Sequence, residues 1–132
     1  MKAIVLATMM LLALGGVASA AQCKPGQVNG RWAAYASLNG FWEECLFVVR
    51  SGDLSGQCRQ TYYPWFKVAG TLKVSRSCRL SGSIWETGSG SFNELIFGTL
   101  QSNGLGGAGV MTDLPGSPIN SAGAHFSLVR RP

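Results

Sequence analysis

The feature that most restricts this chain is a two-residue period. From residue 30 onward, apolar and polar residues alternate, and Gly, Ser, Asn or Asp interrupts them about every 10 to 14 residues. This pattern is typical of antiparallel strands joined by short turns. The 132-residue chain also holds 18 glycines, and glycine costs about 1 kcal/mol relative to alanine inside a helix. We therefore expect an all-β fold and not a helical bundle.

We expect eight strands with short connections between them. They span Arg31–Ser37, Glu43–Arg50, Asp53–Thr61, Phe66–Ser75, Cys78–Glu86, Asn93–Gln101, Gly107–Thr112 and Ala122–Arg130. Strands in this number and spacing predict an antiparallel meander that closes into a small up-and-down barrel. A β-sandwich is the alternative, because it shows the same alternation.

The first segment has the composition of a secretory signal peptide. Met1-Lys2 gives a basic start, Ile4–Leu14 is an apolar run, and Ala18-Ser19-Ala20 fits the small-residue cleavage rule. The apolar run is shorter than the roughly 20 residues of a membrane-spanning helix. We expect residues 1–20 to be removed, no transmembrane segment after cleavage, and one periplasmic or secreted domain over residues 21–132.

Four cysteines follow the predicted signal, and an even number in an exported chain indicates disulfides. Ser51-Gly52 reads as a two-residue hairpin turn, which places Cys45 opposite Cys58. Their Cα atoms would lie about 4.5 Å apart, within disulfide reach. Cys23–Cys78 then follows by elimination, although two other pairings of the four cysteines remain possible. The chain has no Cys-x-x-Cys pair and one histidine, so we expect no metal and no cofactor.

Glycine recurs between apolar residues on the face assigned to the interior. Leu54-Ser55-Gly56 is repeated as Leu80-Ser81-Gly82, and Val68–Leu72 as Ile96–Leu100. Inward glycines either leave room for a ligand or let the strands bend sharply in a small barrel. We favour sharp bending, with Phe47 lying over Gly56.

Gly30-Arg31-Trp32, at the start of the first expected strand, resembles the Gly-x-Trp that opens the first strand of calycins, the lipocalin and avidin-like barrels. Cys45–Val49 followed by Asp53–Gly56 is similar to the first hairpin of avidin-type barrels. The resemblance covers about 30 residues. It implies an eight-stranded barrel with one open mouth for a small ligand, and a Trp32 that closes the floor. The later Trp and Asp positions with which avidin contacts biotin are not matched.

Tyr62-Tyr63-Pro64-Trp65-Phe66 is the most distinctive local motif. Proline donates no ladder hydrogen bond, so the motif belongs in a connection or at the start of a strand. Exposed aromatic side chains on a loop are typical of a binding surface. The candidate ligand-binding residues are therefore Trp32, Tyr62, Tyr63, Trp65 and Phe66. Alternatively, the loop folds over the mouth and supplies missing core.

Catalysis is not expected, and no catalytic residue is assigned. The lone histidine, His125, alternates with Phe126 and Leu128 and should point outward, while the six carboxylates show no spacing that favours an acid–base pair. The net charge is +5, but the basic residues do not form the dense stripe that nucleic-acid binding requires, so we expect no nucleic-acid partner. We expect an exported, soluble binding protein that takes a small apolar or amphipathic ligand at the barrel mouth. The alternative is a module that binds an envelope or secreted protein, such as a hydrolase inhibitor.

Overall fold

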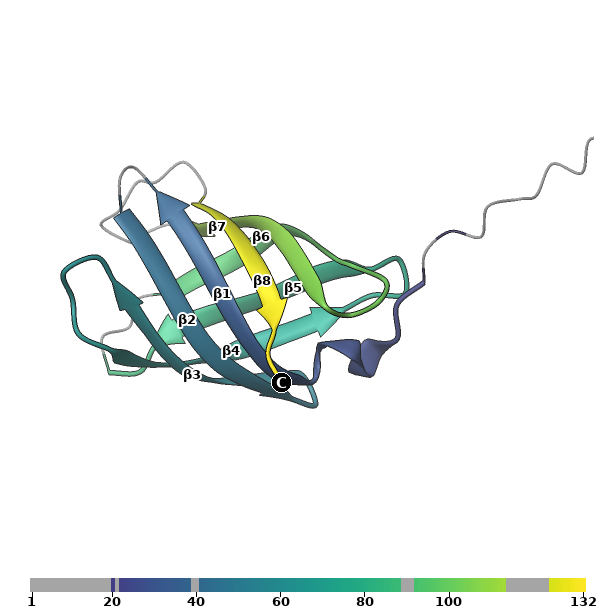
Figure 1. Ribbon diagram of the computed structural model, residues 1–132, viewed down its shortest axis with the longest axis horizontal. Coiled ribbons are helices and arrows are strands. Elements are labelled where there is room, and N and C mark those ends of the chain that lie inside the picture. The colour runs from purple at the N-terminus through teal and green to yellow at the C-terminus, as the bar shows by residue number, and fades with distance from the viewer. Residues whose placement is uncertain (1–19, 21, 39–40, 89–91, 114–123) are drawn as a thin grey trace, which may run out of the picture.

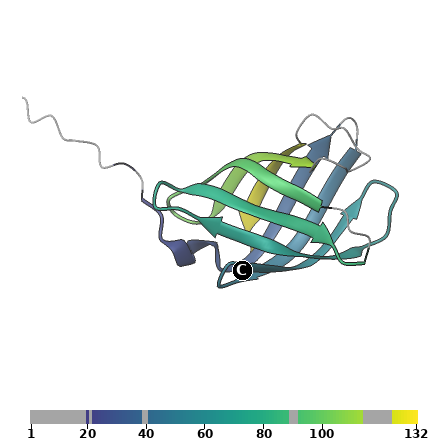
Figure 2. The same ribbon diagram turned by 180° about the vertical axis from the view of Figure 1, so that it is seen from behind.

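The computed structural model describes residues 20, 22–38, 41–88, 92–113 and 124–132. Within these residues, eight antiparallel strands pair in sequence order, and the last strand pairs back with the first, so the sheet closes into a barrel. Figures 1 and 2 show the tilted strands from opposite sides. The expected all-β barrel is confirmed, and the closure excludes the sandwich.

The strands agree with the predicted ranges to within two residues at each end, except that residues 122–123 of the last predicted strand lie outside the described residues. They are β1 Gly30–Leu38, β2 Phe41–Arg50, β3 Asp53–Gln60, β4 Phe66–Val74, β5 Arg79–Glu86, β6 Phe92–Leu100, β7 Gly106–Asp113 and β8 Ala124–Arg130, after a 3-10 helix η1 at Pro25–Val28. No helix in the described part of the chain is long and apolar enough to span a membrane. Residues 1–19 of the predicted signal lie outside the described residues, so cleavage stays a prediction.

The β2–β3 hairpin has the predicted turn and register. Ser51 and Gly52 both have positive φ, 52° and 89°, as a type I′ turn requires. Cys45 therefore lies opposite Cys58, and the two form a disulfide with a Cα–Cα distance of 4.0 Å. Cys23 and Cys78 form a second disulfide among the described residues. The expected pairing of the cysteines is thus confirmed.

Inward glycines allow neighbouring strands to approach closely. A Cβ added to Gly56 would lie 2.2 Å from the carbonyl oxygen of Leu46 and 2.6 Å from the Cα of Phe47. A Cβ on Gly82 would lie 2.1 Å from the carbonyl oxygen of Thr71. Since no real Cβ fits at such distances, these glycines allow the strands to pack closely and bend sharply. This agrees with the interpretation of the inward glycines that we favoured from the sequence.

The two ends of the barrel differ in how they are built. We call the end with the turns at 51–52, 75–78 and 101–105 the floor, and the opposite end the mouth. Helix η1 and the C-terminus both lie at the floor (Figure 1). The most deeply buried side chains of the described core are Val28, Trp32, Val49, Cys58, Leu80 and Leu100. Except for Cys58, they come from η1 or from the strand ends nearest the floor, so the floor is the densely packed half.

Candidate ligand-binding site

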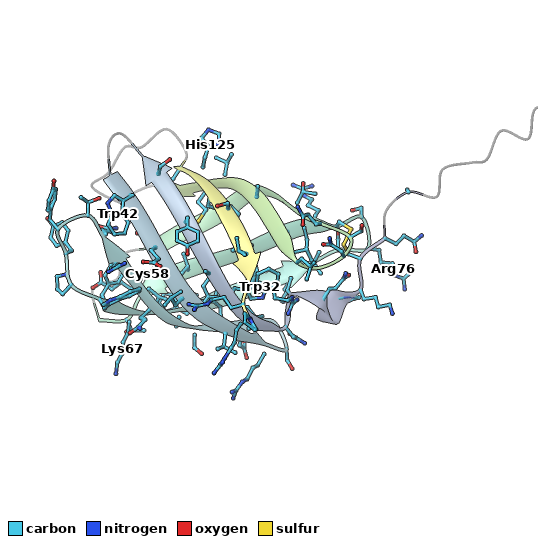
Figure 3. All side chains as sticks on the ribbon, viewed as in Figure 1. Trp32, Trp42, Cys58, Lys67, Arg76 and His125 are labelled. Carbon is cyan, nitrogen blue, oxygen red and sulfur yellow. A yellow bond between two sulfur atoms is a disulfide. The ribbon has the colours of Figure 1, made fainter. Side chains whose placement is uncertain are left out.

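Trp32 closes the floor of the barrel. It lies at the start of β1, is 1% exposed, and donates its indole N–H to the carbonyl oxygen of Val28 at 2.7 Å. The guanidinium carbon of Arg130 lies 4.4 Å from the centre of the Trp32 ring. Figure 3 shows Trp32 near η1 and Trp42 toward the other end of the barrel. Its burial and satisfied N–H make Trp32 part of the structural core.

Arg130 fastens the segments that meet at the floor. Its Nε donates to the carbonyl oxygen of Gly104 at 2.7 Å, and one terminal nitrogen donates to that of Asn29 at 2.8 Å. The other terminal nitrogen donates to the carbonyl oxygen of Gln27. One planar fork thus connects the residues around η1, the β6–β7 turn and the end of β8.

The loop aromatics lie at the mouth, away from Trp32. Tyr62 is 97% exposed, Tyr63 64% and Trp65 39%. Phe66 is half-buried and packs against the core cluster. The structure therefore brings Tyr62, Tyr63, Trp65 and Phe66 together at one end but does not bring Trp32 to them. The alternative in which the whole loop fills the core does not hold for Tyr62 and Tyr63.

The backbone at Tyr62 is held in the left-handed region. Its φ is 69°, a conformation that costs a bulky side chain about 1–2 kcal/mol. The N–H of Tyr63 donates to the carbonyl oxygen of Gln60 at 3.0 Å, which closes a tight turn after β3. This turn projects the Tyr62 ring into solvent, where it makes no contribution to the core.

Outward side chains of β2 and β3 form a cluster with the loop. The guanidinium carbon of Arg59 lies over the Trp42 ring and over the Trp65 ring, 5.5 Å and 4.9 Å from their centres. Arg59 also forms an ion pair with Glu44 at 2.7 Å. Sequence reasoning missed this cluster, although the β2–β3 register contains the signal for it, because Glu44 lies directly opposite Arg59.

A small cavity of about 60 Å³ lies inside the barrel. Ala34 and Ala36 of β1, Cys45 and Phe47 of β2 and Met111 of β7 are among the residues that line it. Inward alanines and Gly82 leave this space between larger neighbours. By comparison, an engineered apolar cavity of about 150 Å³ accepts benzene, so this cavity has room for only a few carbon atoms.

Glu43 adds a carboxylate to the cavity wall. The Gln60 side-chain amide donates to one of its oxygens at 2.7 Å, and the other oxygen lies 3.3 Å from the Cys45 sulfur. The Glu43 carboxylate and the sulfurs of Cys45 and Cys58 lie within 4.8 Å of one another. Because both sulfurs belong to a disulfide, they offer no thiolate to a metal.

His125 is exposed on β8, as the alternation predicted. It points outward in Figure 3 and lies opposite Ser37 and Val110, where it faces no carboxylate in the register. The side chains of Glu94 and Asp113, two of the six carboxylates, lie outside the described residues.

Comparison with known proteins places the fold but not a family. No protein-family model matches the sequence, and neither does any curated protein. Among solved structures, the chain is similar to a redesigned β-barrel, mFAP1, described as bound to DFHBI. The TM-score is 0.62 at 12% sequence identity, over 79% of this chain and 95% of that one. This likeness shows the barrel fold alone, since it does not single out the calycin families.

Proposed function

We propose that this chain is an exported binding protein whose ligand is a small amphipathic molecule held at the barrel mouth. The observation that carries the proposal is the cavity of about 60 Å³ inside the closed barrel. Among the described residues, its wall is formed mostly by apolar side chains and offers one carboxylate, that of Glu43. A cavity of this size takes only the apolar end of a ligand, so the rest would lie at the mouth.

The mouth supplies groups for the remainder of the ligand. Phe66 packs beside the core there, and Tyr62, Tyr63 and Trp65 present exposed rings. Glu43 would accept a hydrogen bond from a hydroxyl or amine on the ligand. In this proposal Trp32 closes the floor and does not touch the ligand. The barrel mFAP1, described as bound to DFHBI, supports the capacity of such an architecture to hold a small molecule.

The test uses 1-octanol as a neutral amphipathic probe, followed by amide chemical shifts. We expect shifts at the residues that line the cavity, and binding at least ten-fold weaker in Ala36→Val, which adds two methyl groups to the cavity wall. The matched control, Ala108→Val, makes the same change at an exposed position of β7. Equal octanol binding by Ala36→Val and the parent chain would overturn the proposal.

Export is tested separately. The two disulfides among the described residues favour an oxidising compartment. We expect the exported protein to begin at Ala21, which the intact mass of secreted or periplasmic material would show. Material that retains residues 1–20, or that carries free thiols, would contradict export.

A second candidate function is a protein-interaction module that uses the aromatic loop. It is favoured by the exposure of Tyr62 and Tyr63 on a turn with a left-handed tyrosine. Trp, Tyr and Arg dominate the binding energy of protein interfaces, and the Trp42–Arg59–Trp65 cluster lies beside this loop. A partner captured from periplasmic extract should be lost when Tyr63 and Trp65 are both changed to Ala. Capture that survives both changes removes the loop from this account.

A further inference from the structure

A groove lies on the outside of the barrel, separate from the interior cavity. It has a volume of about 570 Å³ and runs over the outer faces of β1, β2, β3 and β4. The outward side chains that line it are Arg31, Leu46, Val48, Ser55, Gln57, Lys67 and Arg131, and Pro132 also lines it. Binding pockets for small molecules have volumes of about 300–1,000 Å³, so the groove has the size of such a pocket.

In the groove, the aliphatic side chains lie at the base and the cationic side chains lie at the two sides. The register places Leu46 opposite Gln57 and Val48 opposite Ser55, so β2 and β3 form the base. Arg31 lies on the β1 side, where the backbone N–H of Arg131 donates to its carbonyl oxygen at 2.9 Å. Lys67 lies on the β4 side, opposite Gln57, and points away from the barrel in Figure 3. An apolar base is thus flanked by positive charge on both sides.

No Asp or Glu side chain pairs with these cations among the described residues. The side chains that line the groove include no Asp or Glu, and no salt bridge is formed by Arg31, Lys67 or Arg131 in the described part of the chain. Glu44, the next outward residue of β2, already forms an ion pair with Arg59, with a nitrogen–oxygen distance of 2.7 Å. Asp53, beyond Ser55 on β3, lies opposite Arg50.

We propose that this outer groove binds a small amphipathic anion. The flat apolar body would lie on Leu46 and Val48, and a carboxylate, sulfonate or phosphate group would reach the guanidinium groups of Arg31 and Arg131 or the ammonium of Lys67. The Ser55 hydroxyl and the Gln57 amide are further donors at the base. Charge complementarity selects an anion here, whereas the proposed interior site offers a carboxylate and selects a hydrogen-bond donor. The groove therefore goes beyond the proposed function and does not depend on it.

The experiment uses naphthalene-2-sulfonate, which is too large for a cavity of about 60 Å³. Naphthalene-2-methanol and naphthalene-2-methylammonium serve as neutral and cationic probes of similar shape. We expect the sulfonate alone to shift the amides of 46, 48 and 55–57, with binding that weakens as salt rises from 50 to 500 mM. Arg31→Gln, Lys67→Gln and Arg131→Gln should each weaken binding about three- to five-fold, the upper part of the range measured for exposed ion pairs.

Two controls separate this site from others. Arg79→Gln removes an exposed cation of β5 outside the groove and should leave sulfonate binding unchanged. Ala36→Val, which fills the interior cavity, should also leave it unchanged, so failure of the interior site does not imply failure of the groove. The proposal is overturned if all three probes bind alike, if Arg79→Gln weakens binding as much as Lys67→Gln, or if the shifts map to the cavity.

Discussion

At the scale of single residues, Arg130 joins parts of the chain that are far apart in sequence. Its guanidinium donates to carbonyl groups at Asn29 and Gln27, 101 and 103 residues earlier in the chain. The alternation of β8 places this residue on the same face as Phe126 and Leu128, which indicates nothing about such contacts. The role of Arg130 depends on where η1 folds back, and no local pattern encodes that.

Replacing Arg130 by Lys should lower the free energy of unfolding by about 2 kcal/mol. Lysine keeps the charge but lacks the planar fork, so the carbonyl groups of Gln27, Asn29 and Gly104 cannot all be bonded at once. Urea denaturation followed by tryptophan fluorescence would measure the change. Arg79→Lys, at an exposed position of β5, should change stability by less than about 0.5 kcal/mol. Equal stabilities of the two variants would contradict this role.

Tyr62 should show a conflict between stability and binding. Asn tolerates the left-handed region that Tyr62 occupies at φ 69°. We expect Tyr62→Asn to raise the free energy of unfolding by about 0.5–1 kcal/mol and to weaken any interaction made by the aromatic loop. Thermal unfolding and the octanol and pull-down assays would measure both effects. Tyr63→Asn, whose φ is not positive, should give no gain in stability, and a gain of the same size would refute the argument.

At the scale of strands and hairpins, much of the fold follows from the sequence, because a two-residue turn fixes the register of its hairpin. The Ser51-Gly52 turn sets Cys45 opposite Cys58, so one disulfide and two strand faces follow from it. The register shifts between Leu80 and Gly82 and between Leu95 and Phe97 have no such local signal. They arise where strands bend to close the barrel, which is a property of the whole sheet.

Gly56 should tolerate no side chain. A Cβ there would meet the Leu46 carbonyl oxygen at 2.2 Å, so strands β2 and β3 would have to separate. We expect Gly56→Ala to cost at least about 2 kcal/mol or to prevent folding. At Gly26, in η1, a Cβ would meet its nearest neighbour at 3.7 Å, so Gly26→Ala should be close to neutral. Circular dichroism and urea unfolding of both variants would check this, and equal losses would exclude curvature as the reason.

The disulfides should differ in what they contribute. Cys23–Cys78 closes a loop with a sequence separation of 55 residues and Cys45–Cys58 one of 13. In the chain-entropy account, the longer loop contributes about 4 kcal/mol and the shorter about 3 kcal/mol. In urea denaturation, the Cys23→Ala/Cys78→Ala variant should therefore lose more free energy of unfolding than the Cys45→Ala/Cys58→Ala variant. If the Cys45→Ala/Cys58→Ala variant is instead the less stable of the two, loop length does not determine what each disulfide contributes.

At the scale of the whole molecule, the closure of the barrel rests on the pairing of β1 with β8. Alternation predicted the strands, but it is the same in a sandwich, so the closure itself was not encoded locally. The candidate site shows the same limit. Tyr62, Tyr63, Trp65 and Phe66 are neighbours in sequence and stay together, whereas Trp32 could be placed relative to them only once the barrel had closed.

Amide exchange should divide the barrel into a slow floor and a faster mouth. The floor contains most of the deeply buried side chains of the described core, together with the Arg130 contacts and one disulfide. Local opening is cheaper where fewer buried contacts hold the backbone. We expect amides at 30–33 and 79–82 to exchange more slowly than those at 61–66, as measured by mass spectrometry or NMR. Uniform exchange over the barrel would show that it opens only as a whole.

Both termini of the barrel leave from the floor, as Figure 1 shows for η1 and the C-terminus. A tether attached to either end therefore orients an immobilised barrel with its aromatic loop toward solution. The two attachments are not equivalent, because Arg131 and Pro132 border the outer groove. Anchoring through the segment before Cys23 leaves that groove uncovered as well, which makes the N-terminal side the better handle for biosensor surfaces.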